Sequence, residues 1–254
     1  MKWLIKLIRS LFASKDKPIA LETPAKLPEL GTIEIPKIPT ELYNPKPNRD
    51  NSPVVIVDVY HHDNITDWKK LGEYANAIIL KVSEGSRHKD TNFQEWRILA
   101  RKNNLLVGYY HFFRSHVNPE DQANLFCDQI VRLEKGDFLV CCDFETEDDK
   151  EDGYDILEVE RFNNVVEKRL GMIPAIYGGR LLKENKTPER FKRYPLWLSH
   201  YTSKARPVVP VPWEKELIWQ FTESAKVPGI SNKLGTDLNR FSGTYQDLLK
   251  MCVK

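Results

Sequence analysis

The feature that most constrains the fold of this chain is a series of short apolar runs separated by helix-like segments. The runs have the length and residue types of buried strands, and they cover 53–58, 77–85, 105–112, 138–145, 174–178 and 195–199. Helix-like segments between them include 92–103 and 119–134. Such alternation indicates a parallel sheet covered on both faces. Because several runs end in polar residues, we expect an α/β fold, a TIM-like but irregular β/α barrel with its site at the carboxyl ends of the strands.

The run 138–145 ends in two carboxylates, Asp143 and Glu145. Residues i and i+2 of a strand face the same way, so both side chains should project from the end of this strand. Burying two carboxylates together is costly unless a partner or a reaction needs both. Acid-catalysed cleavage of a glycosidic bond needs such a pair. The structural alternative for each strand-end acid is a helix N-cap in the following loop.

A longer series of motifs extends over residues 53 to 250. It includes Asp58-Val59-Tyr60-His61-His62, Lys81-Val82-Ser83-Glu84-Gly85, Gly108-Tyr109-Tyr110-His111-Phe112, Asp143-Phe144-Glu145, Trp219-Gln220-Phe221 and Asp237-Leu238-Asn239-Arg240-Phe241. In this order the motifs resemble those of the glycoside hydrolase family 25 lysozymes, the Chalaropsis-type N-acetylmuramidases. The resemblance implies a peptidoglycan hydrolase without a cofactor. Its expected reaction is cleavage of the β-1,4 bond between N-acetylmuramic acid and N-acetylglucosamine.

The resemblance also implies a role for each acid. Glu145 would be the general acid, with a pKa raised by neighbouring carboxylates and partial burial. Asp143 would stay ionised and stabilise the substrate's acetamido group or the oxocarbenium-like centre. Direct attack by Asp143 and attack by water remain alternatives. Asp58 and Asp237 match the family's other two acidic positions and are expected to give hydrogen-bonding and electrostatic support, although a turn-forming role is the alternative for Asp237.

Aromatic residues near the expected strand ends are candidates for binding sugar rings, because aromatic faces pack against pyranose C–H groups. They are Tyr60, Tyr110, Tyr177, Trp197 and Tyr201, with core packing as the alternative for each. Tyr60 departs from the Ser that the family usually has, which points to a reshaped subsite. The neighbouring His61 and His62 lack a third ligand at clear spacing, so we expect no metal.

The first fifty residues differ from the rest, so we divide the chain into an N-terminal segment, 1–50, and a catalytic barrel, 51–254. Seven of the sixteen prolines lie in 1–50, which favours an extended arm. Residues 1–12 have the pattern of a basic amphipathic helix. Three interpretations are open: a cleaved signal peptide, a membrane-surface anchor or targeting helix, and a helix that packs on the protein or on a partner.

Composition excludes some classes of function. The net charge of +2 gives no reason to expect a nucleic-acid surface, and no apolar run approaches the roughly 18–20 residues that span a bilayer. Cys127, Cys141, Cys142 and Cys252 are expected to be small buried hydrophobes rather than a disulfide framework. We expect a monomer that acts at the cell wall, in the periplasm or outside the cell. The alternatives are a non-catalytic glycan-binding protein on the same fold and a chitinase-like hydrolase.

Overall fold

The computed structural model describes residues 53–146 and 156–254. Its strands are β1 (Val55–Val59), β2 (Ala77–Glu84), β3 (His88–Lys89), β4 (Leu106–Phe112), β5 (Asp137–Asp143), β6 (Ala175–Gly178), β7 (Leu196–Ser199), β8 (Ile218–Ala225) and β9 (Thr236–Phe241). The helices are α2 (Trp68–Tyr74), α3 (Phe93–Lys102), α4 (Pro119–Ile130), α5 (Ile156–Leu170), α6 (Arg180–Glu184), a 3₁₀ helix (Glu189–Arg193) and α7 (Tyr245–Met251). None of these helices is both long and apolar enough to cross a membrane.

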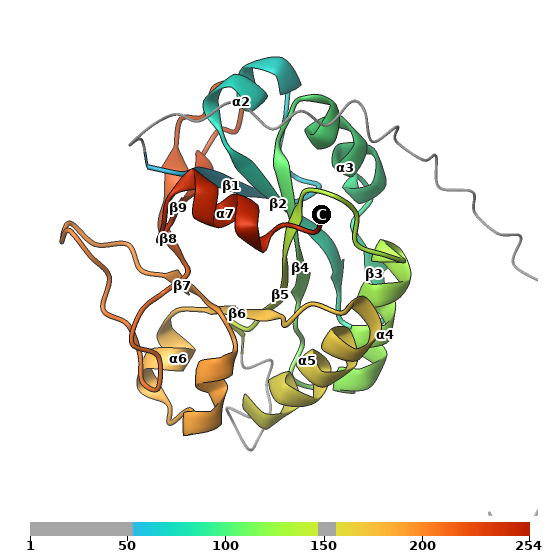
Figure 1. Cartoon of the computed structure of the whole chain (residues 1–254), viewed down its shortest axis with the longest axis vertical. Helices are drawn as coiled ribbons and strands as arrows, with labels where there is room; N and C mark the ends of the chain where they lie inside the picture. Colours follow the sequence, from blue (N-terminus) through green and yellow to red (C-terminus); the bar gives the residue numbers. More distant parts are fainter. Residues whose placement is uncertain (1–52, 147–155) are drawn as a thin grey trace, which may run out of the picture. The chain divides into compact units, whose positions relative to one another are not determined.

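The strands close into a barrel. Their order is β1-β9-β8-β7-β6-β5-β4-β2, and β1 also pairs with β2, so the ring has no open edge; the short β3 adds to the outer side of β2. Strand β9 runs antiparallel to both of its neighbours, β1 and β8, whereas the other neighbouring strands of the ring are parallel. Figure 1 looks into this ring, with α2 to α6 around its outside. The predicted irregular β/α barrel is confirmed.

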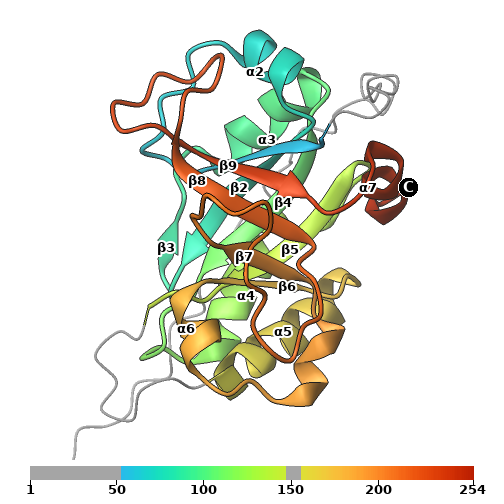
Figure 2. The same ribbon diagram turned by 90° about the vertical axis from the view of Figure 1, so that its left-hand side faces the viewer.

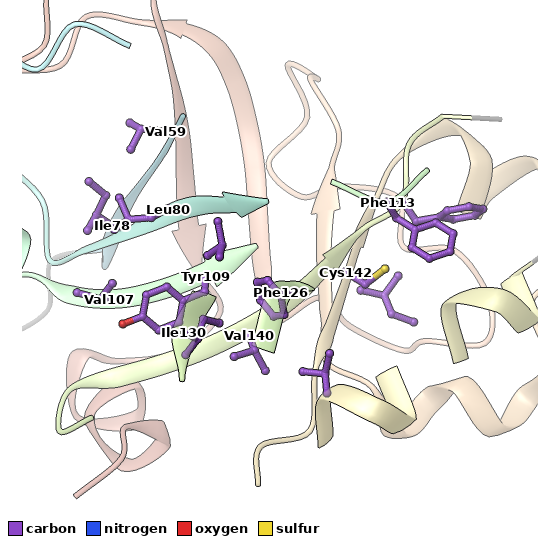
Figure 3. Close-up of a cluster of buried hydrophobic side chains, with 14 of the residues drawn as sticks. Val59, Ile78, Leu80, Val107, Tyr109, Phe113, Phe126, Ile130, Val140 and Cys142 are labelled. Carbon is purple, nitrogen blue, oxygen red and sulfur yellow. The ribbon is translucent and has the colours of Figure 1, made fainter. Parts of the chain in front are cut away.

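Two apolar layers hold the barrel together. One lies between the strands and the outer helices and includes Val140 and Cys142 of β5 with Phe126 and Ile130 of α4 (Figure 3). The other fills the barrel interior, where Leu139 and Cys141 of β5 meet Tyr245 and Leu248 of α7. Adjacent residues of β5 therefore face opposite layers, as the two-residue period of a strand requires.

The beginning of β5 is fixed by a buried polar network. Asp137 is fully buried and accepts hydrogen bonds from the guanidinium of Arg101 and from the Tyr109 hydroxyl, the latter at 2.8 Å. Arg97 lies 3.6 Å from the same carboxylate. A buried carboxylate is tolerated when it is paired and hydrogen-bonded in this way. The network anchors the strand whose other end carries Asp143.

The expected helices and cysteines can be compared directly with the structure. The segment 92–103 contains α3, and the segment 119–134 contains α4, which ends at Ile130 because Val131 has a positive φ of 64°. Cys127, Cys141 and Cys142 are buried free thiols, and Cys252 is partly exposed.

The sequence did not identify β8 and β9 as strands. The expected helix at 1–12 and the proline-rich arm lie outside the described residues, and the domain boundary at residue 50 stays a prediction.

Candidate active site

A cavity of about 280 Å³ opens at the carboxyl ends of the parallel barrel strands. Four acids, one lysine, one glutamine and five aromatic residues line it: Asp58, Asp143, Glu145, Asp237, Lys81, Gln220, Tyr60, Tyr110, Phe112, Tyr177 and Trp197. The structure therefore brings together all four predicted acids and four of the five predicted aromatic residues.

Strand periodicity explains why these side chains meet. On β5, Leu139 and Cys141 face the barrel interior, so Asp143 continues the same face at the strand end. On β2, Ala77 and Ile79 face the interior, and Lys81 follows on that face. The apolar residues deep in the barrel thus give way to polar ones at its mouth.

Asp58 ends up opposite Asp237 because β1 and β9 pair antiparallel with these two residues in register. Asp58 is 7% exposed and accepts hydrogen bonds from Asn239 Nδ2 at 2.6 Å and from Gln220 Nε2 at 3.1 Å. Burial raises the pKa of Asp58 to about 6, against these hydrogen bonds. Burial and the charge of Asp58 raise the pKa of Asp237 to about 9, so Asp237 holds a proton and the two carboxyl groups hydrogen-bond to each other.

Asp143 is 5% exposed, and its Oδ1 atom has no hydrogen-bond partner among the described residues. Burial, together with the like charge of Glu145, raises the pKa of Asp143 well above its usual range, while Lys81 opposes the shift. The surroundings of Asp143 therefore work against the ionised form that the sequence led us to expect. A hydrogen bond donated to Oδ1, or a nearby cation, would favour the ionised form.

Glu145 follows β5 and is exposed at the mouth of the cavity. Its pKa is raised because the surrounding protein displaces water from the carboxyl group, whereas Tyr177, Lys81 and Arg114 oppose the shift. The direction agrees with the expectation for a general acid. The cause differs in part, since the repulsion between the two carboxylates acts mainly on the more deeply buried Asp143.

The aromatic candidates fall into two groups. Tyr110, Tyr177 and Trp197 are buried in the cavity wall, and the rings of Tyr177 and Trp197 lie 4.7 Å apart. Tyr60 and Tyr201 are exposed, at 40% and 48%. Tyr201 does not line the cavity, but its hydroxyl donates to Gln220 Oε1 at 2.8 Å and thereby contacts the site indirectly.

A second, larger hollow of about 880 Å³ continues from the cavity, since Tyr60 and Asp237 line both. Its walls come from the turn after β1 with Asp63, from the end of β8 with Glu223, and from the β8–β9 connection with Asn232. The amide of Asn232 donates a hydrogen bond to Asp63, whose other oxygen accepts from the Tyr60 backbone N–H at 2.8 Å. These bonds fix the turn on which Tyr60 stands.

Gln220, Asn239 and Lys81 were not singled out as site residues, although each belongs to a motif identified in the sequence. Gln220 Oε1 accepts from the hydroxyls of Tyr177 and Tyr201, which leaves its Nε2 to donate to Asp58. Asn239 Oδ1 accepts from Trp197 Nε1 at 2.7 Å. For Lys81 and Gln220 the available signal was a polar residue at an inward-facing position of an apolar run, whereas the strand of Asn239 has no such run.

Of the two histidines beside Tyr60, His62 lines the larger hollow, and His61 lines neither cavity. His61 Nδ1 lies 3.0 Å from Asp90 Oδ2, and the rings of His61 and His62 are 4.0 Å apart. Among residues 53–146 and 156–254, no group of three or more His, Cys, Asp or Glu side chains is arranged to hold a metal ion.

Comparison with known proteins shows one consistent similarity. A sequence model described as glycosyl hydrolases family 25 matches residues 57–230. The uncharacterized protein YegX of Escherichia coli O6:H1 is 31% identical over 199 residues, which cover 76% of this chain and 71% of YegX. The autolytic lysozyme of Clostridium acetobutylicum is 23% identical over 190 residues, 73% of this chain and 55% of the lysozyme. A bacterial lysozyme structure from Streptomyces coelicolor matches with a TM-score of 0.71 at 21% identity, covering 80% of this chain and 98% of that one.

Proposed function

Because this chain belongs to glycosyl hydrolases family 25, we propose that it acts as an N-acetylmuramidase through the four carboxyl groups at the mouth of its barrel. It is a glycoside hydrolase of the lysozyme type, and peptidoglycan is its substrate. The observation that carries the assignment of residues is the shared cavity of Asp58, Asp143, Glu145 and Asp237. Proton delivery and charge stabilisation at one glycosidic bond require acids in such proximity.

In the proposed reaction Glu145 gives its proton to the oxygen that leaves the sugar ring. Its raised pKa and its exposed place at the cavity mouth both suit this role. Asp143 accepts a hydrogen bond from the acetamido N–H of the substrate, or faces the positive charge that develops at the anomeric carbon. Its unpartnered, buried Oδ1 supports the first of these roles, because an unsatisfied buried acceptor is stabilised by a new donor. Direct attack by Asp143 and attack by water remain alternatives.

Asp58 and Asp237 act in this proposal as a supporting pair. Gln220 and Asn239 both donate to Asp58, so the polar groups around it are fixed before substrate arrives. Tyr110, Tyr177 and Trp197 form the aromatic wall against which a sugar ring packs, and Tyr60 stands where the cavity opens into the larger hollow. The continuous hollow supports binding of more than one sugar unit.

The proposal on location follows from the substrate. The enzyme acts on the cell wall, and we place its action in the periplasm or outside the cell. We further propose that it works as a monomer, without a nucleic-acid partner, and that residues 1–12 make the contact with a membrane or a secretion partner. Their basic amphipathic pattern motivates this last proposal.

The deciding experiment is mass spectrometry of the fragments released from purified peptidoglycan. N-acetylmuramic acid at the new reducing end would support the proposal. N-acetylglucosamine at that end would contradict it, as would the absence of cleavage by folded protein. Chitin oligosaccharides incubated in parallel separate a muramidase from a chitinase-like hydrolase, and Glu145→Gln provides the inactive reference.

A further inference from the structure

Lys81 is the one cationic side chain among the described residues that line the catalytic cavity, where four acids also lie. It continues the inward-facing series of β2, and its side chain is only 11% exposed. A lysine loses hydration when it is buried, so its position here requires compensating contacts.

The compensation comes from a set of contacts outside the proposed catalytic residues. Lys81 Nζ lies 2.6 Å from Glu84 Oε2, and the other carboxylate oxygen of Glu84 accepts from Arg114 Nε at 3.0 Å. The Lys81 ammonium and the Arg114 guanidinium both lie over the Phe112 ring, at 4.7 Å and 4.6 Å from its centroid. Glu84 is thus held by two cations, and a fixed Glu84 in turn fixes Lys81.

The loop that carries Arg114 is itself anchored to a helix. Gln122 of α4 donates from Nε2 to the Arg114 carbonyl at 2.9 Å and accepts the Arg114 backbone N–H at 2.9 Å. The same Gln122 oxygen lies 3.1 Å from Nε2 of the buried His111. The position of the ammonium is therefore determined by the barrel and α4, and it does not depend on a flexible side chain alone.

The groups that face Asp143 are mostly acidic. The acids are Glu145, which follows Asp143 in the chain, Asp58 of β1 and Glu84 of β2. The hydroxyl groups of Tyr110 on β4 and Tyr177 on β6 also face Asp143. Lys81 supplies the opposing positive charge. Burial and these acids favour a neutral Asp143, and Lys81 favours an ionised one.

We propose that Lys81 is a positioning residue for the reaction, whose ammonium, held by Glu84, shifts Asp143 towards its ionised form in a cavity whose other charged residues are acids. This inference rests on the proposed function for its meaning in catalysis. The electrostatic relationship itself can be measured without any turnover.

The test is a carbon-13 NMR titration of the Asp and Glu carboxyl groups in the whole, substrate-free chain, with the Asp143 signal assigned by its loss in Asp143→Asn. Wild type is compared with Lys81→Met and Lys81→Gln, which remove the charge, and with Lys81→Arg, which keeps it. Lys70→Met is the matched control, because Lys70 also pairs with an acid three residues away, but on the exposed surface.

Loss of the charge should move the midpoint of the Asp143 titration upward by about one pH unit, at the low end of what a nearby opposite charge produces. Lys81→Arg and Lys70→Met should leave it in place. In hydrolysis assays the acidic limb of the rate profile should move upward by a similar amount in Lys81→Met. If Lys81→Met folds but the midpoint of the Asp143 titration does not move, the proposal is overturned. A rise in KM without that shift in the midpoint has the same consequence. Because the titration uses no substrate, failure of muramidase activity is a separate result.

Discussion

Asp58 and Asp237 face each other across the antiparallel pair of β1 and β9, and their carboxyl groups hydrogen-bond to each other. The pKa of Asp237 is raised to about 9 and that of Asp58 to about 6. A carboxyl group with a raised pKa binds more protons in the folded chain than in the unfolded chain. Its contribution to stability is therefore present at low pH and is lost as the pH rises through the pKa that the group has in the folded chain.

Asp237→Asn should reduce this pH dependence. In wild type the free energy of unfolding should decline between pH 6 and 9, with a slope of at most about 1.4 kcal/mol per pH unit from this one proton. The amide resembles the protonated acid and cannot titrate, so the slope in that interval should flatten. Urea unfolding followed by tryptophan fluorescence at pH 5, 7 and 9 measures it. An equal slope in the two proteins would show that Asp237 is not the group responsible.

Glu145→Gln should lower the rate of peptidoglycan hydrolysis by about 10²–10⁴-fold, the usual contribution of a general acid. Gln keeps the shape of the side chain but cannot deliver a proton. Dye release from labelled cell walls gives the rate, and pull-down with the same walls gives binding, which should be nearly unchanged. Glu184→Gln, on the exposed face of α6, is the control. Near-wild-type turnover by folded Glu145→Gln would remove Glu145 from its proposed role.

Asp143→Asn should also be severely impaired, by about 10²–10³-fold, because the negative charge that faces the developing cation or the acetamido group is lost. In the proposed mechanism Asp143 is ionised, so the variant should also lower the pKa of Glu145 by removing a like charge, while burial continues to raise it. The pH–rate profile of the remaining activity should therefore lose its alkaline limb at a lower pH than wild type. An alkaline limb at the wild-type position would argue against coupling between the two acids.

Tyr60→Ser should change the preference among native, deacetylated and O-acetylated peptidoglycan. Tyr60 is 40% exposed and lines both the catalytic cavity and the larger hollow, so its ring lies where the two meet. Initial rates on the three substrates give the ratios to compare. If all three rates change by the same factor, Tyr60 contributes to packing or general affinity and does not select the substrate.

Deletion of residues 1–30 should leave the melting temperature and the hydrolysis of soluble wall fragments close to those of the full chain. The closed ring is complete within residues 55–241, which is the physical reason for this expectation. Binding to anionic lipid vesicles, or export, should change if residues 1–12 target the protein. Loss of folding would refute the idea that this segment contributes little to the barrel.

The parallel strands β1, β2 and β4 to β7 were accessible from the sequence because they are continuous apolar runs with distinct ends. The run 138–145 contains most of β5, but the strand ends at Asp143, so Glu145 lies in the following segment and not on the strand itself. By contrast, β9 contains Asp237, Asn239 and Arg240 among its six residues and lacks an apolar run. Its place in the ring is set by pairing with β1 and β8, which no local pattern reveals.

The site was predictable in its residues but not in all of their charges. Strand ends and the family motifs gave the four acids that line the cavity. The raised pKa of Asp143 depends on burial and on charges from β1, β2 and the following loop, which come together only in the closed barrel. Gln220 was hidden for a similar reason, because its bonds join residues 19, 43 and 162 positions away.

The reversed direction of β9 has a practical consequence for handling the enzyme. The strand carries Asp237 near its beginning at the mouth, and the chain then leaves towards α7 at the other end of the barrel (Figure 2). There the Val253 backbone N–H donates to the Asp137 carbonyl, at the start of the same β5 whose last residue is Asp143. Seven strand residues span roughly 20 Å. A tag, dye or resin linked to the C-terminus is therefore attached on the side away from the cavity, which leaves the entrance open to an insoluble polymer.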